Sequence, residues 1–337
     1  MKTSWQPYDI AKLTGYSPST VSKVFRGYRD VGEEARNKIM EAAKQTGYIS
    51  KYRFFHETSV REGVIAVVYD DWRGLQNPFF SEVLNSVRET LGELGYDILL
   101  IRKHPPEDLE ELCVKRQVDG ILLISTDSDF HITYRQLFQK FPIVSLNEVF
   151  VNEYSVLSNN AQGIRKAMEY LIRLGHKKIA MITGELNQKP GIERFKEYRE
   201  CLSENGIRFS KKYVKNCTYY SYEEGYEIMK KLLEQVQPTA VLATGDYLCM
   251  GAIDYAVKAG YQVPQDISFV GFDDIEYARV FKPALTTVRQ NKELLGKVAA
   301  ELLLDLVSGK KPHKKRYLID TELILRESST NWKGTEL

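Results

Sequence analysis

Near its N-terminus the chain alternates apolar and polar positions with a helical period in three short stretches. The first covers residues 7–14. The second starts at Ser17 and Pro18, which suit an N-cap and a first helical turn, and it stops at Gly27. The third covers residues 32–46. Three short helices, two of them joined by a turn that contains glycine, predict a helix-turn-helix unit.

From residue 64 the pattern changes to short apolar runs, rich in β-branched side chains, that alternate with amphipathic helical stretches. The predicted strands are residues 64–69, 96–101, 120–125, 143–146, 178–183, 240–244 and 267–272. The predicted helices between them include residues 79–94, 161–174, 192–205, 223–235 and 247–259. This alternation favours parallel sheets covered on both faces, and the number of elements favours two doubly wound lobes. Ligands of such lobes bind at the carboxyl ends of the strands.

A polar and charged stretch, residues 49–62, connects the two patterns. It includes the aromatic pair Phe54 and Phe55, and we expect a linker that can become helical on binding. The chain is therefore predicted to be an α/β protein in three parts. These are a helix-turn-helix DNA-binding head in residues 1–48, the linker, and a core in residues 63–337.

The charge is nearly balanced overall but unevenly distributed. The 337 residues include 47 Lys and Arg against 45 Asp and Glu, a formal net charge of +2. Residues 1–60 contain ten basic and six acidic side chains, whereas the rest of the chain contains 37 and 39. A basic head on a slightly acidic body indicates a polyanionic partner for the head.

The composition argues against several classes of protein. The four cysteines are far apart and form no C-x-x-C pair, so we expect buried or half-buried free thiols in a reducing compartment. The five histidines lack metal-ligand spacing, so no metal site is expected. No apolar run approaches the roughly 18 residues of a membrane span, and the N-terminus lacks the apolar segment of a signal peptide. These features predict a cytoplasmic protein without a membrane partner.

The second predicted helix carries a polar stripe. Ser19, Ser22, Lys23 and Arg26 are spaced i, i+3, i+4 and i+7, opposite an apolar face. Hydroxyl groups and a helix N-terminus suit phosphate oxygens, and a lysine or arginine can reach guanine in the major groove. The alternative is a solvated face of a small helical bundle. Helix-turn-helix spacing, the Ser-Pro start and the local positive charge favour DNA binding.

Residues 8–27, YDIAKLTGYSPSTVSKVFRG, closely resemble the N-terminal signature of LacI/GalR-type transcriptional regulators. Further motifs follow in family order along nearly the whole chain. They are VGEEAR at 31–36, GY at 47–48, NPFF at 77–80, VDG at 118–120, LGHK at 174–177, VGFDD at 270–274, PALTTVRQ at 283–290 and TEL at 321–323. One such motif would be weak, but the ordered set is highly specific.

The resemblance implies a homodimeric, repressor-type regulator whose periplasmic-binding-protein-like core binds a small effector, often a sugar, between two lobes. One lobe is expected to comprise about residues 63–158 and 288–318, and the other about 159–287 and 319–330. A two-fold dimer with two recognition helices implies a palindromic operator in double-stranded DNA. Effector and operator affinities are then reciprocally coupled, with the effector acting either as an inducer or as a corepressor.

The resemblance also implies two sets of DNA contacts. Contacts with the DNA backbone match Tyr8, Ser17, Thr20 and Ser22. Base-reading positions match Pro18, Ser19 and Lys23. Lys23 replaces the more usual Arg, and Arg26 replaces a commoner Asn. Because a lysine fixes guanine less strictly than an arginine fork, the operator sequence stays open.

The linker departs from the family in a second way. The family sequence A-R-x-L, whose Leu wedges into the minor groove, aligns with Phe54, Phe55, His56 and Glu57. Glu57 therefore places a carboxylate where the family has an apolar wedge. Either Phe54 or Phe55 supplies the wedge, or the linker does not intercalate, and both alternatives stay open.

Family positions that contact the effector also have counterparts. They are Phe79, Asn159, Arg194, Tyr220, Asp246 and Asp273. Carboxylates and arginine form charge-assisted hydrogen bonds with sugar hydroxyls, and an aromatic ring can cover an apolar sugar face.

Most of these positions have a purely structural alternative. For Arg194 and Asp273 it is a salt bridge on the surface or between the lobes. For Phe79 and Tyr220 it is a place in the core. Asp246 directly precedes a predicted helix, and there an N-cap is the favoured interpretation.

Departures from the family also occur around the expected effector site. Gly245 stands where the family has Asn, and Asn159 stands where Asp is frequent. The loop at residues 70–77 is about three residues longer than usual and carries Trp72 and Arg73. We expect this loop to edge the pocket, and the effector to be larger than a simple hexose, or anionic.

An enzyme is not expected. His176 lies in the LGHK motif, for which the family implies a structural role, and no nucleophile motif accompanies it. The sequence contains neither G-x-G-x-x-G nor G-x-x-x-x-G-K-[ST], so no cofactor is expected. A sugar-binding transport component is a weaker alternative, because it would lack the head. A global carbon regulator with a phosphorylated carrier protein as corepressor is an alternative within the family.

Overall fold

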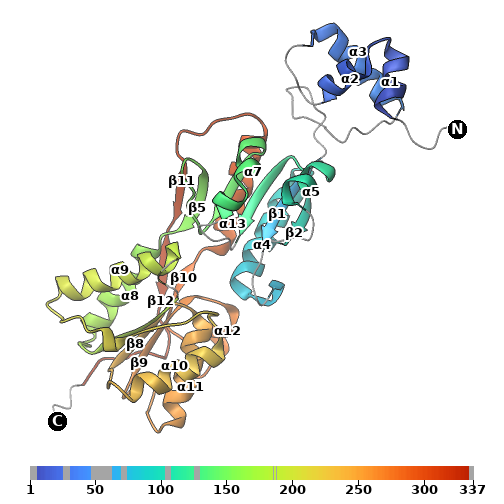
Figure 1. The fold of residues 1–337 in the computed structure, drawn as a ribbon. Coiled ribbons are helices and arrows are strands. Elements are labelled where there is room, and N and C mark those ends of the chain that lie inside the picture. The colour runs from blue at the N-terminus through green and yellow to red at the C-terminus, as the bar shows by residue number, and fades with distance from the viewer. Residues whose placement is uncertain are drawn as a thin grey trace.

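The structure is a computed structural model and describes residues 6–25, 31–46, 63–69, 74–102, 108–124, 130–184, 186 and 188–333. In Figure 1 these residues form a small helical head and two α/β lobes. Within the described ranges, no helix is long and apolar enough to cross a membrane.

The head contains the three predicted helices, α1 (Pro7–Thr14), α2 (Pro18–Phe25) and α3 (Glu33–Thr46). α1 ends because Gly15 adopts a left-handed conformation with φ 77°, and its amide donates to Ala11 O at 2.9 Å. Ser17 directly precedes α2, and its Oγ accepts a hydrogen bond from the Thr20 amide at 3.1 Å. The helices enclose an apolar core that includes Ile10, Val21, Val24, Phe25 and Ile39. The predicted helix-turn-helix unit is confirmed.

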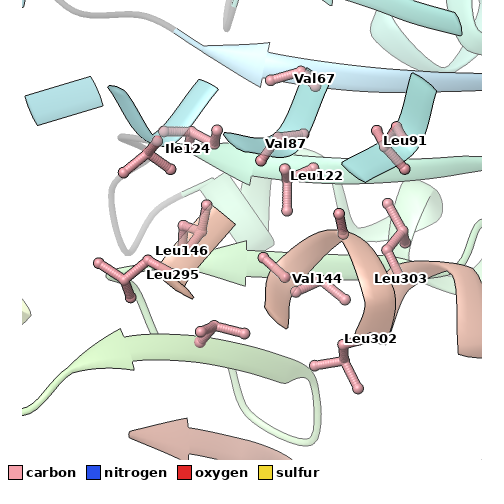
Figure 2. Close-up of a cluster of buried hydrophobic side chains, with 14 of the residues drawn as sticks. Val67, Val87, Leu91, Leu122, Ile124, Val144, Leu146, Leu295, Leu302 and Leu303 are labelled. Atoms are coloured by element: carbon pink, nitrogen blue, oxygen red, sulfur yellow. The ribbon is translucent and has the colours of Figure 1, made fainter. Parts of the chain in front are cut away.

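The first lobe is built on a six-stranded parallel sheet with the order β11-β5-β4-β3-β1-β2. Its strands are β1 (Val64–Tyr69), β2 (Asp97–Ile101), β3 (Gly120–Ile124), β4 (Ile143–Leu146), β5 (Tyr154–Ser158) and β11 (Arg316–Ile319). Its helices are η1 (Gly74–Gln76), α4 (Pro78–Glu93), α5 (Leu109–Lys115), α6 (Phe130–Thr133), α7 (Arg135–Lys140) and α13 (Lys292–Val307). α4 and α13 cover one face of the sheet, where Val87, Leu303 and Leu122 share one buried cluster (Figure 2).

The second lobe is built on a six-stranded sheet with the order β12-β10-β9-β8-β6-β7. Its strands are β6 (Ile179–Thr183), β7 (Val214–Asn216), β8 (Ala240–Ala243), β9 (Ser268–Asp273), β10 (Thr287–Gln290) and β12 (Thr321–Ile324). Its helices are α8 (Asn160–Arg173), α9 (Lys189–Glu204), η2 (Lys211–Tyr213), α10 (Tyr222–Leu233), α11 (Asp246–Lys258) and α12 (Glu276–Val280). α8 and α9 cover one face, and α10 to α12 cover the other. β12 runs antiparallel to β10, an exception to the parallel sheets that the sequence predicts.

All seven predicted strands are present, but β5, β7, β10, β11 and β12 were not predicted. The three edge strands among them, β7, β11 and β12, are short and partly exposed, whereas β5 contains two serines and β10 has one apolar residue, so none stands out as an apolar run. Because β10 pairs with β9, the chain returns to the first lobe after Gln290 rather than at residue 288.

The chain passes between the lobes three times, each time through one residue. Asn159 separates β5 from α8, Asn291 separates β10 from α13, and Asp320 separates β11 from β12. Two of these crossings are tied together, because Asn159 Nδ2 donates to Asp320 Oδ1 at 3.3 Å. Since β5, β10 and β11 all end at a crossing, the carboxyl ends of both sheets point towards the boundary between the lobes.

Candidate functional site

The outer side of α2 carries the residues predicted to contact DNA. Side chains are exposed at Ser17, Pro18, Ser19 and Lys23, and half-buried at Thr20 and Ser22. Ser17 Oγ lies 2.7 Å from Ser19 Oγ and 2.8 Å from Thr20 Oγ1, so three hydroxyls cluster at the N-terminus of the helix. Hydroxyl groups at a helix N-terminus suit an anionic group such as a phosphate.

Tyr8, a further predicted DNA contact, is 58% exposed on α1. The Lys12 ammonium lies 4.7 Å from the centroid of its ring, so a cation accompanies the exposed tyrosine. Arg26 of the predicted polar stripe lies outside the described residues, as do the linker positions Phe54, Phe55 and Glu57. The alternatives for the linker therefore remain predictions.

A second group of polar side chains lies at the carboxyl ends of β6, β8 and β9. Its centre is Arg194 on α9, which is 6% exposed. Arg194 Nε donates to Asn160 Oδ1 at 2.8 Å and Nη1 donates to Thr244 O at 2.9 Å. The guanidinium also lies 3.9 Å from the centroid of the Phe272 ring. These contacts all lie within the second lobe and fix the orientation of a buried cation, unlike the interlobe salt bridge that was the structural alternative.

Tyr220 precedes α10 and packs against two glycines. A Cβ at Gly184 would lie 1.7 Å from the Tyr220 hydroxyl, and a Cβ at Gly245 would lie 3.1 Å from its ring. Burial raises the pKa of Tyr220 to about 12, although the nearby Arg194 opposes this shift, and its hydroxyl interacts with Thr244. The hydroxyl is therefore neutral at physiological pH. Gly245, where the family has Asn, leaves room for the ring.

Asp246 is 1% exposed and does not cap α11. The helix begins at Asp246 itself and its N-cap is Gly245, so the favoured interpretation of Asp246 as an N-cap is wrong. Thr287 Oγ1 donates to Asp246 Oδ1 at 2.6 Å, and the Ile275 amide donates to Oδ2 at 2.9 Å. Burial and the neighbouring Asp273 carboxylate raise the pKa of Asp246 well above its ordinary value. The neighbouring carboxylate thus disfavours the charged form of Asp246.

Asp273 ends β9 with a positive φ of 116°, and Asp274 follows with φ 52°. Gln290 Nε2 donates to Asp273 Oδ1 at 2.6 Å. The Asp274 carboxylate forms ion pairs with Arg289 at 2.7 Å and Arg326 at 2.6 Å. Burial alone would raise the pKa of Asp274, but the two arginines outweigh it and lower the pKa. The turn after β9 is therefore held in an uncommon backbone conformation by its side chains.

Two further predicted effector contacts, Phe79 and Asn159, lie within the described residues. Phe79 is 8% exposed in the core of the first lobe, 5.1 Å from Phe80 between ring centroids, as its structural alternative predicts. Asn159 occupies a crossing and caps α8, its Oδ1 accepting from the Gln162 amide at 3.2 Å. Trp72 and Arg73 lie outside the described residues.

Three neighbours of the site were not predicted from the sequence. Asn160 positions Arg194, Gln290 positions Asp273, and Lys292 donates to the Asp274 carbonyl oxygen at 2.8 Å. A signal for Lys292 exists in the sequence, because a lysine in the first turn of a helix is electrostatically unfavourable and needs compensation.

His176 and the cysteines occupy structural positions. His176 is 1% exposed, with Nε2 3.1 Å from Thr330 O and Nδ1 3.0 Å from Thr239 Oγ1. Because a carbonyl only accepts, Nε2 carries the proton and Nδ1 accepts from Thr239. The cysteines, at positions 113, 201, 217 and 249, are free and buried, as expected. Among the described residues, no group of His, Cys, Asp and Glu could hold a metal ion.

Two family models match this chain. The model for bacterial regulatory proteins of the lacI family matches residues 8–51, and the model for a periplasmic binding protein-like domain matches residues 168–329. The first match covers the head, which a transport component with the same core would lack. The transport alternative is therefore not favoured.

Curated relatives match over nearly their whole length. The HTH-type transcriptional repressor PurR of Mannheimia succiniciproducens is 30% identical over 331 residues, which cover 95% of this chain and 97% of that protein. The ribose operon repressor of Haemophilus influenzae is 32% identical over 332 residues, with the same coverage.

Similar solved structures are also regulators. A complex of the transcriptional regulator CelR with cellobiose has a TM-score of 0.73 and 28% identity, and the match covers 96% of this chain and 100% of that chain. A lac repressor dimer bound to operator and the anti-inducer ONPF has a TM-score of 0.71 and 25% identity, and the match covers 97% and 100%. The relatives are repressors rather than enzymes. The chain therefore belongs to the lacI family of bacterial regulatory proteins and is a DNA-binding transcriptional regulator.

Proposed function

We propose that this regulator represses transcription as a homodimer on a palindromic operator, and that a sugar or sugar derivative bound between the lobes controls its operator affinity. The observation that carries the effector assignment is the convergence of Arg194, Tyr220 and Asp273 at the strand ends of the second lobe. A fixed cation, a carboxylate and an aromatic ring match the hydroxyls and the apolar face of a carbohydrate. The ribose operon repressor and the cellobiose complex support this class.

The proposed DNA interface is the outer side of α2, with Lys23 reading bases and the hydroxyl cluster holding phosphate. A dimer bound to operator among the similar structures supports the two-fold arrangement. We propose residues 1–48 as the DNA-binding unit and 49–62 as the linker to the core, and the cytoplasm as the site of action.

The effector proposal is tested by titration calorimetry of the full-length protein against ribose, cellobiose, glucuronate and glucose 6-phosphate. At least one of these should bind, and Asp273→Asn should weaken that binding about tenfold, the size of one lost charge-assisted hydrogen bond. Asp305→Asn is the matched control, because Asp305 lies in the last turn of α13 and forms a partly exposed ion pair with Lys310. Binding of none of the four compounds would contradict the proposal.

The same titration tests the expected preference for a larger or anionic effector. If Trp72 and Arg73 edge the pocket, glucuronate or glucose 6-phosphate should bind more tightly than ribose, and Arg73→Ala should remove that preference. Tight binding of a neutral monosaccharide that Arg73→Ala leaves unchanged would refute it.

The DNA proposal is tested with an operator selected from a random-sequence pool. Lys23→Ala should weaken binding by about 1–3 kcal/mol and relax the base preference at one position of each half-site. Lys38→Ala, an exposed lysine on α3, is the matched control. Equal losses in the two variants would show that Lys23 contributes only unspecific charge.

A further inference from the structure

Lys292 is a buried lysine at an electrostatically unfavourable place. It is the first residue of α13, where the helix dipole is positive, and it is 7% exposed. A charged amine in such a position requires oxygen partners.

Those partners come from both lobes. Lys292 Nζ donates to Asp274 O at 2.8 Å and to Asp273 O at 3.2 Å, and both carbonyls belong to the turn after β9 in the second lobe. The same ammonium lies 3.1 Å from Glu82 Oε2 on α4 of the first lobe. One buried cation therefore spans the crossing at Asn291.

The turn that Lys292 holds also belongs to the candidate effector site. The Asp273 carboxylate accepts from Gln290, while its own carbonyl faces Lys292. The positive φ angles at Asp273 and Asp274 let consecutive carbonyls converge on one donor. Any rotation of the lobes that moves this turn away from α4 must break the bonds to Glu82 or to the two carbonyls.

We propose that Lys292 is a positioning residue that couples the effector-binding turn of the second lobe to α4 of the first. Coupling requires a group whose contacts differ between two arrangements, and a three-way contact across a single-residue crossing meets that requirement. The link from Asp273 to an effector rests on the proposed function, whereas the mechanical link between the lobes does not.

The test measures the arrangement of the lobes without any effector. Spin labels at Glu89→Cys on α4 and Lys231→Cys on α10 report an interlobe distance distribution in the full-length protein. The parent chain without these substitutions checks that the four buried cysteines stay unlabelled. Lys292→Met should shift the ratio of lobe arrangements by about tenfold, as expected for the loss of hydrogen bonds to a charged group. Lys297→Met, an exposed lysine on the same helix, should leave the distribution unchanged.

Two further variants keep the test decisive. Lys292→Arg retains the charge and should keep most of the parent distribution, which a role in packing alone would not predict. If Lys292→Met does not fold, Glu82→Gln removes only the first-lobe partner, a half-exposed side chain, and should still broaden the distribution. An unchanged distribution in folded Lys292→Met, or in Glu82→Gln, overturns the proposal. Because no sugar is present, failure of the sugar titration does not affect this result.

Discussion

The two lobes use the same strand order but differ at the sixth strand. β11 is parallel to its neighbour in the first lobe, whereas β12 is antiparallel to its neighbour in the second. The reason lies at Asp320, because the chain leaves β11 at its carboxyl end and enters β12 at once. Since the carboxyl ends of both sheets point to the boundary, a strand that continues straight across must run against the second sheet. The difference shows that one chain segment serves as an edge of both sheets.

The lobes also differ in what they bury at those carboxyl ends. In the described part of the first lobe, the polar residues buried near such ends include Ser145, Ser158 and, after β4, Glu148. The second lobe buries Arg194, Asp246 and Gln290 at equivalent ends. Charged groups cost more to desolvate than hydroxyls, so the hydrogen-bonded burial of Arg194 and Asp246 indicates that the second lobe supplies strong directional polar contacts.

The largest expected effect that tests this comparison is on the stability of the second lobe. Arg194→Met should lower the free energy of unfolding by about 3 kcal/mol, because Asn160 Oδ1 and Thr244 O lose a buried donor. Urea unfolding followed by circular dichroism measures the change. Arg199→Met, an exposed arginine on the same helix, is the control, and equal losses in the two variants would contradict the central role of Arg194.

A smaller effect is expected from crowding Tyr220. Gly184→Ala should cost about 1–3 kcal/mol, since its Cβ would occupy the space of the Tyr220 hydroxyl. The same substitution in a Tyr220→Leu background should cost little, because the clashing hydroxyl is gone. A double-mutant cycle on unfolding free energies measures the difference, and an additive result would place Tyr220 away from Gly184.

A pH effect should distinguish the amino ends of the two sheets. Burial lowers the pKa of His176, despite the opposing hydrogen bond to Thr330, so the unfolded chain binds the proton more readily. Stability from this group is therefore present above the ordinary pKa of about 6.5 and is lost as the pH falls below it. In the first lobe, Asp119 occupies the place of Thr239, accepting from the Gly63 and Val64 amides.

The free energy of unfolding should fall less steeply in His176→Gln than in the parent protein as the pH decreases from 7.5 to 5.5. This is the range in which an ordinary histidine titrates. His313→Gln, an exposed histidine, should leave the slope as it is. The same slope in all three proteins would place the responsible proton elsewhere.

The smallest effect should come from the first lobe. Ser158→Ala should change the unfolding free energy by less than about 0.5 kcal/mol, because its buried hydroxyl has no hydrogen-bond partner among the described residues. Gln290→Leu, at the equivalent end of β10, should cost about 1 kcal/mol, since Asp273 loses a donor. Comparable losses measured by urea unfolding would remove the asymmetry between the lobes.

The sequence predicts the parts of this molecule that depend on local pattern. Apolar runs identify the central strands, and Ser17, Pro18 and Gly15 mark the helix boundaries of the head. The edge strands β7, β11 and β12 are not predicted, because their formation depends on pairing with strands that are distant in the sequence. Matching family positions name Arg194, Tyr220 and Asp273 as effector contacts, and the structure brings these three side chains near one another.

The local pattern fails where a side chain turns towards a distant partner. Asp246 is of a residue type that often caps helices, yet its carboxylate accepts hydrogen bonds from Thr287 and Ile275. These partners are too distant in the sequence for a local pattern to predict them. Lys292 is similar, because its partners lie on two other elements and one of them belongs to the other lobe.

The single-residue crossings at Asn159, Asn291 and Asp320 also constrain how this protein can change through inheritance. Neither lobe is a continuous stretch of the gene, so one recombination breakpoint inside the core would mix parental sequences within a sheet. An inserted residue at Asp320 would turn every following side chain of β12 to the opposite face. Homologous sequences should therefore vary in loop length far from these three codons. The gene segments that encode the two lobes should be inherited together.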